Sequence, residues 1–401
     1  MIPVQRKRAR IGILDHTGPI LGGAQLVVSH MAAILAQDYD VELIHDGKPH
    51  DLASLSAAFL VDLTKVKERA IPHLKTSFGV PGFYGLFQPS DRITRSLSEP
   101  YDLFIYSGHG IPPPCFAKRG LVYCHFPFEA SPLEALKEVA RWTQQIRIAR
   151  VIKTAGYRRM WRIRMHGYQR ILANSQFTAR WIQRRWDRAA EVAYPPVDLN
   201  PPVTEKRPVI VSVGRFTGVR TSKNQLDQVT AFREFLNTVR EQWSLRLIGS
   251  CGEASKDRDY LEMVRTAACG LPVQLLVNVD RTIIIQALAE AKLFWHTMGL
   301  SNDETKWPEY AEHFGIATVE AMRAGCVPSV IDSGGQREII EDGVSGWQAK
   351  DLPELVQKSS AVARDAKLLM LMGERARQRS MIFTGTIFGE RLKRIVSQCL
   401  N

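Results

Sequence analysis

The sequence predicts an α/β protein built from two Rossmann-like domains, and three features of the chain indicate this fold. Patterns typical of short buried strands alternate with helical patterns in both halves, as in parallel sheets that are covered by helices on both faces. A proline-rich segment at residues 194–208 separates the two halves, with four prolines within eight residues. The length of 401 residues is sufficient for two domains of ordinary size.

In the N-terminal half, the sequence predicts a β–loop–α–β unit followed by further strands. The apolar run Ile11–Leu14 is typical of a buried strand, the glycine-containing segment HTGPILGGAQ of a loop, and LVVSHMAAILA of a helix. Residues 51–100 give no clear pattern beyond a loop rich in Gly, Pro and aromatic residues. The other strands are expected at Val41–His45, Leu103–Tyr106, Leu121–Tyr123 and Ile171–Ala173, and a helix is expected from Phe177 to about Trp186.

In the C-terminal half, the alternation of strands and helices is clearer. The proline cluster before it is incompatible with a helix interior or a central strand and is therefore interpreted as an interdomain linker. Strands are expected at Val209–Val213, Leu245–Ile248, Val273–Val277, Leu293–Trp295 and Val327–Ile331, and helices at Gln225–Arg240, Tyr260–Ala268, Thr282–Ala291 and Ile316–Ala324. We therefore expect domains at residues 1–198 and 199–380 and a final helix at residues 381–401.

The composition excludes several classes of protein. Hydrophobic residues make up 45% of the chain and charged residues 23%, an ordinary globular mixture that excludes global disorder and fibrous repeats. The six cysteines are scattered without a CxxC pair, which argues against a disulfide scaffold or zinc ribbon and favours reduced thiols in the cytoplasm. The first apolar run is too short for a signal peptide, and we expect no transmembrane segment.

The net charge of +12 is concentrated in one basic block. Between Lys137 and Arg170 the sequence contains ten Lys or Arg residues and one acidic residue, Glu138. Three interpretations are open for this block: an anionic membrane surface or acidic acceptor, a solvated helix with one face packed on its domain, or nucleic acid, for which no binding motif is present. The membrane or acceptor surface is expected to comprise Arg147, Arg150, Lys153, Arg158, Arg159, Arg162 and Arg164.

The segment EHFGIATVEAMRAGCVPSVIDSGGQREIIEDGVSGW at residues 312–347 carries the strongest functional signal. Glu312 precedes a helix that Gly315 opens, and Glu320 lies inside that helix. The two carboxylates can complement the helix dipole, or each can accept two hydroxyl hydrogen bonds from a sugar. After the next strand, Gly334 and Gly335 precede a helix, where backbone N–H groups can approach an anion.

Three further groups follow predicted strands, where Rossmann-like sheets bind ligands. Arg215 and Lys223 flank the segment RFTGVRTSK, and cations at this place suit a diphosphate. The loop with Gly18, Gly22 and Gly23 lacks the GxGxxG spacing of a dinucleotide site and can equally be a simple turn. His125 follows the strand Leu121–Tyr123, where it can be a packed structural residue or part of a site.

The 312–347 segment resembles the E-x7-E signature of glycosyltransferase family 4, the retaining enzymes with two facing Rossmann domains and a cleft between them (the GT-B fold). The resemblance extends over most of residues 205–347 and is patchy over 1–198. The sequence Glu312-His313-Phe314-Gly315 is similar to that of the mannosyltransferases that extend the dolichol-linked oligosaccharide, and to sequences of bacterial polysaccharide and lipid glycosyltransferases. The resemblance implies that the first domain binds the acceptor, that the second binds the nucleotide sugar, and that the final helix crosses back to the first.

The resemblance also implies the roles of individual residues. Glu320 is expected to bind the ribose hydroxyls and Glu312 the hydroxyls of the transferred sugar, which His125 also contacts. Arg215 and Lys223 are expected to stabilise the diphosphate, with Arg220 as an alternative to Lys223 because the gap is longer than usual. The donor site is completed by Gly22, Gly23, Gly315, Ile316, Gly334 and Gly335.

The predicted activity is a retaining, metal-independent transfer of a hexose, with GDP-mannose as the first candidate donor, to a lipid-linked glycan or glycolipid. No cofactor beyond the donor substrate is expected, and the protein is expected in the cytoplasm, peripheral to the inner face of the membrane. The segment with Asp303 and Glu304 lacks a DxD pattern and is expected to be a structural loop, so no metal site is predicted. The alternatives are a UDP-sugar with a soluble or polysaccharide acceptor, a phosphorylase or epimerase on the same fold, and a non-enzymatic basic membrane- or nucleic-acid-binding protein.

Overall fold

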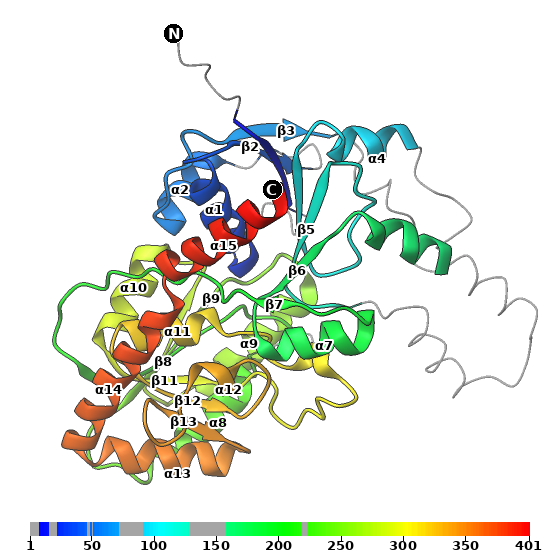
Figure 1. Ribbon diagram of the computed structural model, residues 1–401. Helices are drawn as coiled ribbons and strands as arrows, with labels where there is room; N and C mark the ends of the chain where they lie inside the picture. The colour runs from blue at the N-terminus through cyan, green and yellow to red at the C-terminus, as the bar shows by residue number, and fades with distance from the viewer. Residues whose placement is uncertain are drawn as a thin grey trace, which may run out of the picture. The chain divides into compact units, whose positions relative to one another are not determined.

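The computed structural model consists of two compact units (Figure 1). The N-terminal unit comprises Met1–Pro196 together with Gly385–Asn401, and the C-terminal unit comprises Val197–Thr384. Both contain a parallel sheet with helices, so the predicted fold class is confirmed. The structure describes residues 8–15, 22–45, 49, 51–71, 91–128, 158–218 and 223–401.

The N-terminal unit is built on a seven-stranded parallel sheet with the order β3-β2-β1-β4-β5-β6-β7. Its central strands β1 and β4 are almost entirely buried, which explains their uninterrupted apolar sequences. The strand order reverses direction at β1, where open sheets of this kind form ligand sites. The strands are β1 (Arg10–Asp15), β2 (Asp40–His45), β3 (Lys67–Ala70), β4 (Leu103–Gly108), β5 (Arg119–Cys124), β6 (Arg170–Ala173) and β7 (Glu191–Val192).

One helix of the N-terminal unit comes from the end of the chain. In Figure 1, α15 (red) lies beside α1 (blue), and Lys393 of α15 forms an ion pair with Asp38 at 2.8 Å. Gly389 allows this close packing, because a Cβ there would lie 3.3 Å from Ile34. The labelled helices of the unit are α1 (Gly23–Leu35), α2 (Leu52–Phe59), α4 (Asp91–Ser98), α7 (Gln176–Trp186) and α15 (Gly385–Leu400).

The C-terminal unit is built on a six-stranded parallel sheet with the order β10-β9-β8-β11-β12-β13. The order reverses between β8 and β11, so the carboxyl ends of these two strands mark the expected ligand site. The strands are β8 (Arg207–Val213), β9 (Ser244–Gly249), β10 (Val273–Val277), β11 (Ala291–His296), β12 (Val327–Ile331) and β13 (Trp347–Ala349). The last of them, β13, was not predicted.

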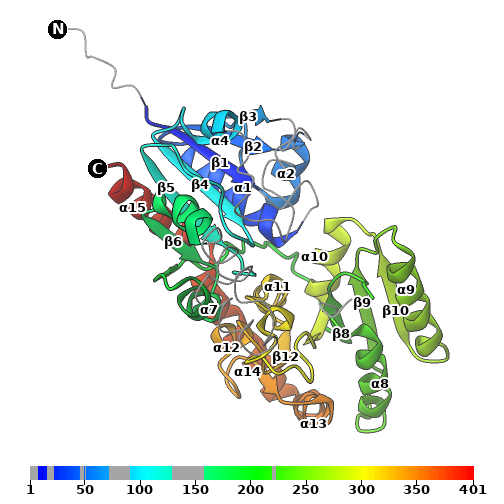
Figure 2. The same cartoon turned by 90° about the vertical axis from the view of Figure 1, so that its right-hand side faces the viewer.

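The helices of the C-terminal unit cover this sheet, with α9 near its β10 edge (Figure 2) and α8 between α9 and α13. The predicted helix at Gln225–Arg240 ends earlier, at Leu236, and the predicted helix at Tyr260–Ala268 begins earlier, at Ser255. The helices are α8 (Gln225–Leu236), α9 (Ser255–Ala268), α10 (Arg281–Glu290), α11 (Ile316–Arg323), α12 (Gln336–Ile339), α13 (Leu352–Ala363) and α14 (Ala366–Ser380), with 3-10 turns η1 (Pro308–Tyr310) and η2 (Met381–Phe383).

An aromatic cluster fixes strand β11 from one side of the sheet. The indole of Trp295 lies 5.8 Å from the ring of Phe235 and 6.5 Å from that of Phe232, and its Nε1–H donates to Ser359 Oγ at 2.9 Å. Consecutive side chains of a strand point to opposite faces. The next residue, His296, is therefore directed away from this cluster.

Among the helices of the described ranges, none combines the length and the apolar composition that crossing a membrane requires.

Candidate active site

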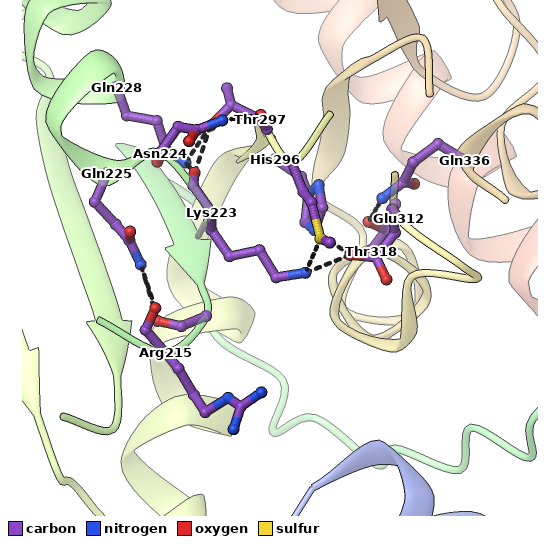
Figure 3. A network of polar contacts seen from close by, with 12 residues as sticks. Arg215, Lys223, Asn224, Gln225, Gln228, His296, Thr297, Glu312, Thr318 and Gln336 are labelled. Carbon is purple, nitrogen blue, oxygen red and sulfur yellow. Dashed lines mark hydrogen bonds and ion pairs between the residues drawn. The ribbon is translucent and has the colours of Figure 1, made fainter. Parts of the chain in front are cut away.

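Lys223, His296 and Glu312 meet at the carboxyl ends of β8 and β11 (Figure 3). Lys223 Nζ forms an ion pair with Glu312 Oε2, and His296 Nε2 lies 2.8 Å from the same oxygen. Lys223 Nζ also contacts Met298 Sδ at 3.0 Å. Both predicted residues, Lys223 and Glu312, therefore lie in one cluster with a histidine that the sequence analysis did not single out.

The charges of this cluster depend on one another. Burial alone raises the pKa of Glu312, but the Lys223 ammonium and the hydrogen bond from His296 lower it more, so that pKa lies well below its usual range. Burial lowers the pKa of His296, and the Lys223 charge lowers it further, against the opposing effect of Glu312. At neutral pH Glu312 is therefore a carboxylate and His296 a neutral imidazole. To bond a carboxylate, that imidazole must carry its proton on Nε2.

The backbone around Lys223 is held by polar contacts from α8 and from Thr297, the residue that follows β11. The carbonyl oxygen of Lys223 accepts hydrogen bonds from Gln228 Nε2 at 2.9 Å and Thr297 Oγ1 at 2.6 Å. Asn224 adopts a left-handed conformation, with φ of 51°, and its Nδ2 donates to Thr297 O at 2.7 Å. A Cβ at Gly214 would overlap the Lys223 side chain, so this glycine makes room for it.

Arg215 follows β8 and is exposed. Its carbonyl oxygen accepts from Gln225 Nε2 at 3.1 Å, which fixes its backbone (Figure 3). No described residue makes a hydrogen bond or ion pair with its guanidinium. The alternative cation Arg220 lies outside the described residues.

Glu320 lies in α11, and both of its carboxylate oxygens bind Arg281, the first residue of α10. Arg281 Nη1 donates to Oε2 at 3.1 Å, and Nη2 forms an ion pair with Oε1. The Glu320 side chain is 5% exposed and that of Arg281 is 30% exposed. Gly315 begins α11 with φ of 119°, followed by Ile316 as its first helical residue. The sequence analysis identified Glu320, Gly315 and Ile316 but missed Arg281.

Gly334 and Gly335 pack tightly against the segment that carries Glu312. A Cβ at Gly334 would overlap the Glu312 carbonyl oxygen, and one at Gly335 would lie 2.6 Å from the carbonyl oxygen of His313. Gly335 N–H donates to Glu312 O at 2.7 Å, and Gly334 N–H donates to Glu304 Oε1 at 2.6 Å. Both N–H groups are thus engaged within the protein. The prediction of an open anion site here is corrected to a turn that positions Glu312.

The acidic segment before η1 is a structural loop. The second oxygen of Glu304 accepts from Arg337 Nη1 at 2.8 Å, and Arg337 also binds Asp332. Asp303 accepts from the backbone and side chain of Thr305, at 3.0 and 2.6 Å. These contacts tie the loop to the turn before α12 and to itself.

In the N-terminal unit, His125 lies at the carboxyl end of β5 and is buried. Its Nε2 is 3.0 Å from Ser107 Oγ of β4, and its carbonyl oxygen accepts from Asn174 Nδ2 at 2.9 Å. Gly22 caps α1 and Gly23 begins it, and both are exposed. Gly18 lies outside the described residues. The predicted N-terminal residues therefore lie at the carboxyl edge of this sheet, and their contact with a sugar or diphosphate stays a prediction.

The described part of the basic block forms a helical segment at residues 158–166. Arg158, Arg159 and Arg162 are exposed, whereas Arg164 is 7% exposed and cannot belong to a surface. Trp161 packs edge-on against Trp186 of α7, with 6.1 Å between ring centroids. The segment thus packs on its domain with one face and presents arginines on the other. Arg147, Arg150 and Lys153 lie outside the described residues.

Comparisons with known proteins match the C-terminal unit to a family. Residues 200–379 match the model of the family described as glycosyl transferases group 1. Over 186 residues, the chain is 31% identical to a Mus musculus protein named GDP-Man:Man(3)GlcNAc(2)-PP-Dol alpha-1,2-mannosyltransferase, covering 42% of this chain and 35% of the relative. The Homo sapiens protein of the same name is 29% identical over 230 residues, covering 51% and 44%. The chain thus spans between about a third and a half of these relatives.

Solved structures match nearly the whole chain. HepE of Anabaena, in complex with UDP and glucose, gives a TM-score of 0.65 at 16% identity, covering 97% of this chain and all of that one. A glycosyltransferase from Rickettsia africae gives a TM-score of 0.69 at 14% identity, covering 98% and 99%. At these identities the likeness concerns the fold alone, and it confirms the predicted GT-B class of two Rossmann-like units.

Proposed function

We propose that this chain, whose residues 200–379 match the model of the glycosyl transferases group 1 family, is a retaining, metal-independent hexosyltransferase. The proposed donor is a nucleotide diphosphate sugar, with GDP-mannose first. The proposed acceptor is a lipid-linked glycan or glycolipid. The observation that carries the proposal is the cluster of Lys223, His296 and Glu312 at the carboxyl ends of β8 and β11. The names of the mouse and human relatives support mannose and a lipid-linked acceptor.

In this proposal, cations stabilise the departing diphosphate. Arg215 and Lys223 supply two positive charges near the end of β8, and the N-terminus of α11 at Gly315 and Ile316 adds backbone N–H groups. Interactions with charge that develops in the transition state lower the barrier, and one such donor contributes about 3–4 kcal/mol. Because these charges can neutralise the leaving group, the proposed reaction requires no divalent ion. Transfer in excess EDTA should therefore keep its rate, and loss of transfer that Mg²⁺ restores would refute this point.

Glu312 is proposed to hold the transferred sugar. Its Oε2 is shared by Lys223 and His296, whereas no described residue donates a hydrogen bond to Oε1. Oε1 is therefore proposed to accept hydroxyl hydrogen bonds from the hexose. When the diphosphate departs, the Lys223 ammonium can move toward its negative charge, while His296 keeps the Glu312 carboxylate in place. For retention, we propose front-face attack in which the leaving phosphate oxygen takes the proton of the acceptor hydroxyl.

The acceptor is proposed to lie at a membrane surface on the cytoplasmic side. The exposed Arg158, Arg159 and Arg162 support this, because clustered arginines attract anionic headgroups. Changing all three to Gln should abolish binding to phosphatidylserine-containing vesicles at low salt. The matched control changes three exposed basic residues of the C-terminal unit, Arg233, Lys256 and Arg375, and should leave binding intact. Equal binding by both triple variants would favour the packed-helix interpretation and a soluble acceptor.

Thermal unfolding with GDP, UDP, ADP and their sugars tests the donor site. A ligand at 100 times its dissociation constant stabilises the protein by about 2.7 kcal/mol, which gives a clear shift of the midpoint. One diphosphate should raise the midpoint, and Lys223→Ala should reduce the shift. The exposed control Arg233→Gln should not. A response to UDP alone would replace the GDP proposal, and no response to any nucleotide would refute the donor site and favour a non-enzymatic protein.

A further inference from the structure

The contact between Arg281 and Glu320 occupies the carboxylate that is proposed to bind ribose. The two nitrogens of the guanidinium fork each bind a different carboxylate oxygen, Nη1 to Oε2 at 3.1 Å and Nη2 to Oε1. The two residues come from different helices, α10 and α11. The Glu320 side chain is 5% exposed and that of Arg281 is 30% exposed, so the carboxylate is buried while the arginine still reaches solvent.

The chemistry of this contact matches that of a ribose. A guanidinium fork presents two parallel N–H donors to the two oxygens of one carboxylate. The 2′ and 3′ hydroxyls of a ribose are also two adjacent donors. A buried carboxylate without any partner would be costly, so Glu320 requires donors when no nucleotide is bound. Arg281 supplies them in the number and arrangement that the ribose would.

We propose that Arg281 is a placeholder for the ribose of the donor. It orients the buried Glu320 carboxylate in the free protein, and nucleotide binding exchanges its fork for the two ribose hydroxyls. The released guanidinium turns toward solvent, where it is already partly exposed. This inference rests on the proposed function, and it adds that part of the binding free energy of the ribose is offset by the lost ion pair.

A second ion pair of α10 provides a matched control. Arg246 of β9 binds Glu290 at the other end of α10, with Nη1 2.7 Å from Oε2, and the second oxygen of Glu290 accepts from Gln286. This pair is about as buried as the first, at 19% and 14% exposure. Arg246→Gln therefore weakens the packing of the same helix without touching Glu320.

The test compares ribonucleotide and 2′,3′-dideoxynucleotide binding by calorimetry, with whichever of GDP, UDP or ADP the wild-type protein binds. Arg281→Gln should lower the unfolding midpoint of the free protein. It should bind the ribonucleotide about tenfold more tightly than wild type, with little change for the dideoxynucleotide. Arg246→Gln should lower the midpoint without changing the ratio of the two affinities. If Arg281→Gln is poorly folded, Arg281→Lys retains a cation without the fork and should shift the ratio in the same direction.

The outcomes separate this inference from the proposed function. If the wild type binds a nucleoside diphosphate and the ratio is the same in the Arg281 variants, the pair is only structural and the placeholder is refuted while the function stands. Weaker ribonucleotide binding by Arg281→Gln refutes it too, because Arg281 would then contact the donor directly. If neither the wild type nor any Arg281 variant binds a nucleotide, both proposals are wrong.

Discussion

The loop that carries Glu312 and the helix that carries Glu320 present two carboxylates with opposite arrangements. At Glu312, a lysine and a histidine share one oxygen, and no described residue donates to the other. At Glu320, one arginine occupies both oxygens. The difference indicates that the carboxylate proposed to bind the reacting sugar keeps one oxygen available. The carboxylate proposed to bind ribose has both oxygens occupied until the nucleotide binds.

The largest expected effect is on catalysis at Glu312. Glu312→Gln keeps the size of the side chain but removes its charge and leaves Lys223 without its counterion. We expect kcat to fall by about 100-fold or more, because the proposed hydrogen bonds to the hexose lose their charged acceptor and Lys223, which is proposed to stabilise the departing diphosphate, loses the carboxylate that positions it. The dissociation constant of the nucleoside diphosphate should change little. Steady-state kinetics and calorimetry measure the two quantities, and Glu253→Gln, an exposed glutamate, is the control. If the affinity for the nucleoside diphosphate fell by the same factor as kcat, Glu312 would contribute to binding of the ground state.

The turn that supports Glu312 should be the next most sensitive. Gly334 has φ of 60°, and a Cβ there would overlap the Glu312 carbonyl oxygen. Gly334→Ala should lower the free energy of unfolding by about 2–5 kcal/mol through strain and overpacking. Gly270 has φ of 76° with no atom within 4 Å of its added Cβ, so Gly270→Ala should cost only about 1–2 kcal/mol. Denaturant unfolding that gives equal losses would contradict the tight packing at Gly334.

The pH dependence of the protein's stability tests the protonation of His296, which lies beside Lys223 and Glu312. Burial and the charge of Lys223 hold the pKa of His296 below its ordinary value. Between that pKa and about 6.5, the unfolded chain therefore binds a proton that the folded protein does not, so stability falls as the pH drops. The loss is at most about 1.4 kcal/mol per pH unit for one proton.

Replacing His296 with a residue that cannot titrate should reduce this dependence of stability on pH. His296→Gln retains an amide donor for Glu312 but cannot titrate, so its stability should change less than that of the wild type between pH 7 and 5. The exposed His166→Gln should follow the wild type. Denaturant unfolding at several pH values measures this, and identical slopes for all three proteins would show that His296 is not the titrating group. Glu312, whose pKa lies well below its usual range, adds a separate loss at lower pH.

The smallest effect is expected at the loop that binds Gly334. Glu304→Gln retains one hydrogen bond to the turn but loses the ion pair with Arg337, whose side chain is 40% exposed and also binds Asp332. Exposed ion pairs contribute little, so the free energy of unfolding should fall by less than about 1 kcal/mol. A loss as large as that of Gly334→Ala, measured in the same way, would show that this loop is essential to the position of Glu312.

The sequence predicted the fold and two of the three residues in the cluster of Lys223, His296 and Glu312. It also predicted Glu320, but without its partner Arg281. Buried apolar strands and the proline linker identify the two sheets, because such patterns are local. Lys223 and Glu312 follow strands that are neighbours in the sheet, and this made their proximity predictable. His296 carries the same signal as His125, a histidine directly after a buried apolar run, and could have been found in that way.

The remaining contacts depend on tertiary structure. Arg281 begins a helix without any motif, and its alignment with Glu320 follows from how α10 and α11 pack, which no local pattern records. Gly334 and Gly335 fit two physical roles, an anion site and a close approach of two backbones. Only the position of the 312–314 segment distinguishes them.

The position of α15 also affects how the protein folds during its synthesis. This helix packs on α1, yet it is encoded after the whole of Val197–Thr384. At ~5–20 residues per second, a ribosome needs roughly 10–40 s to traverse the intervening unit. During that time the surface of α1 around Ile34 has no cover from Gly389 and its neighbours. The N-terminal unit, although synthesised first, is therefore completed last, and a chaperone has a defined interval in which to bind it.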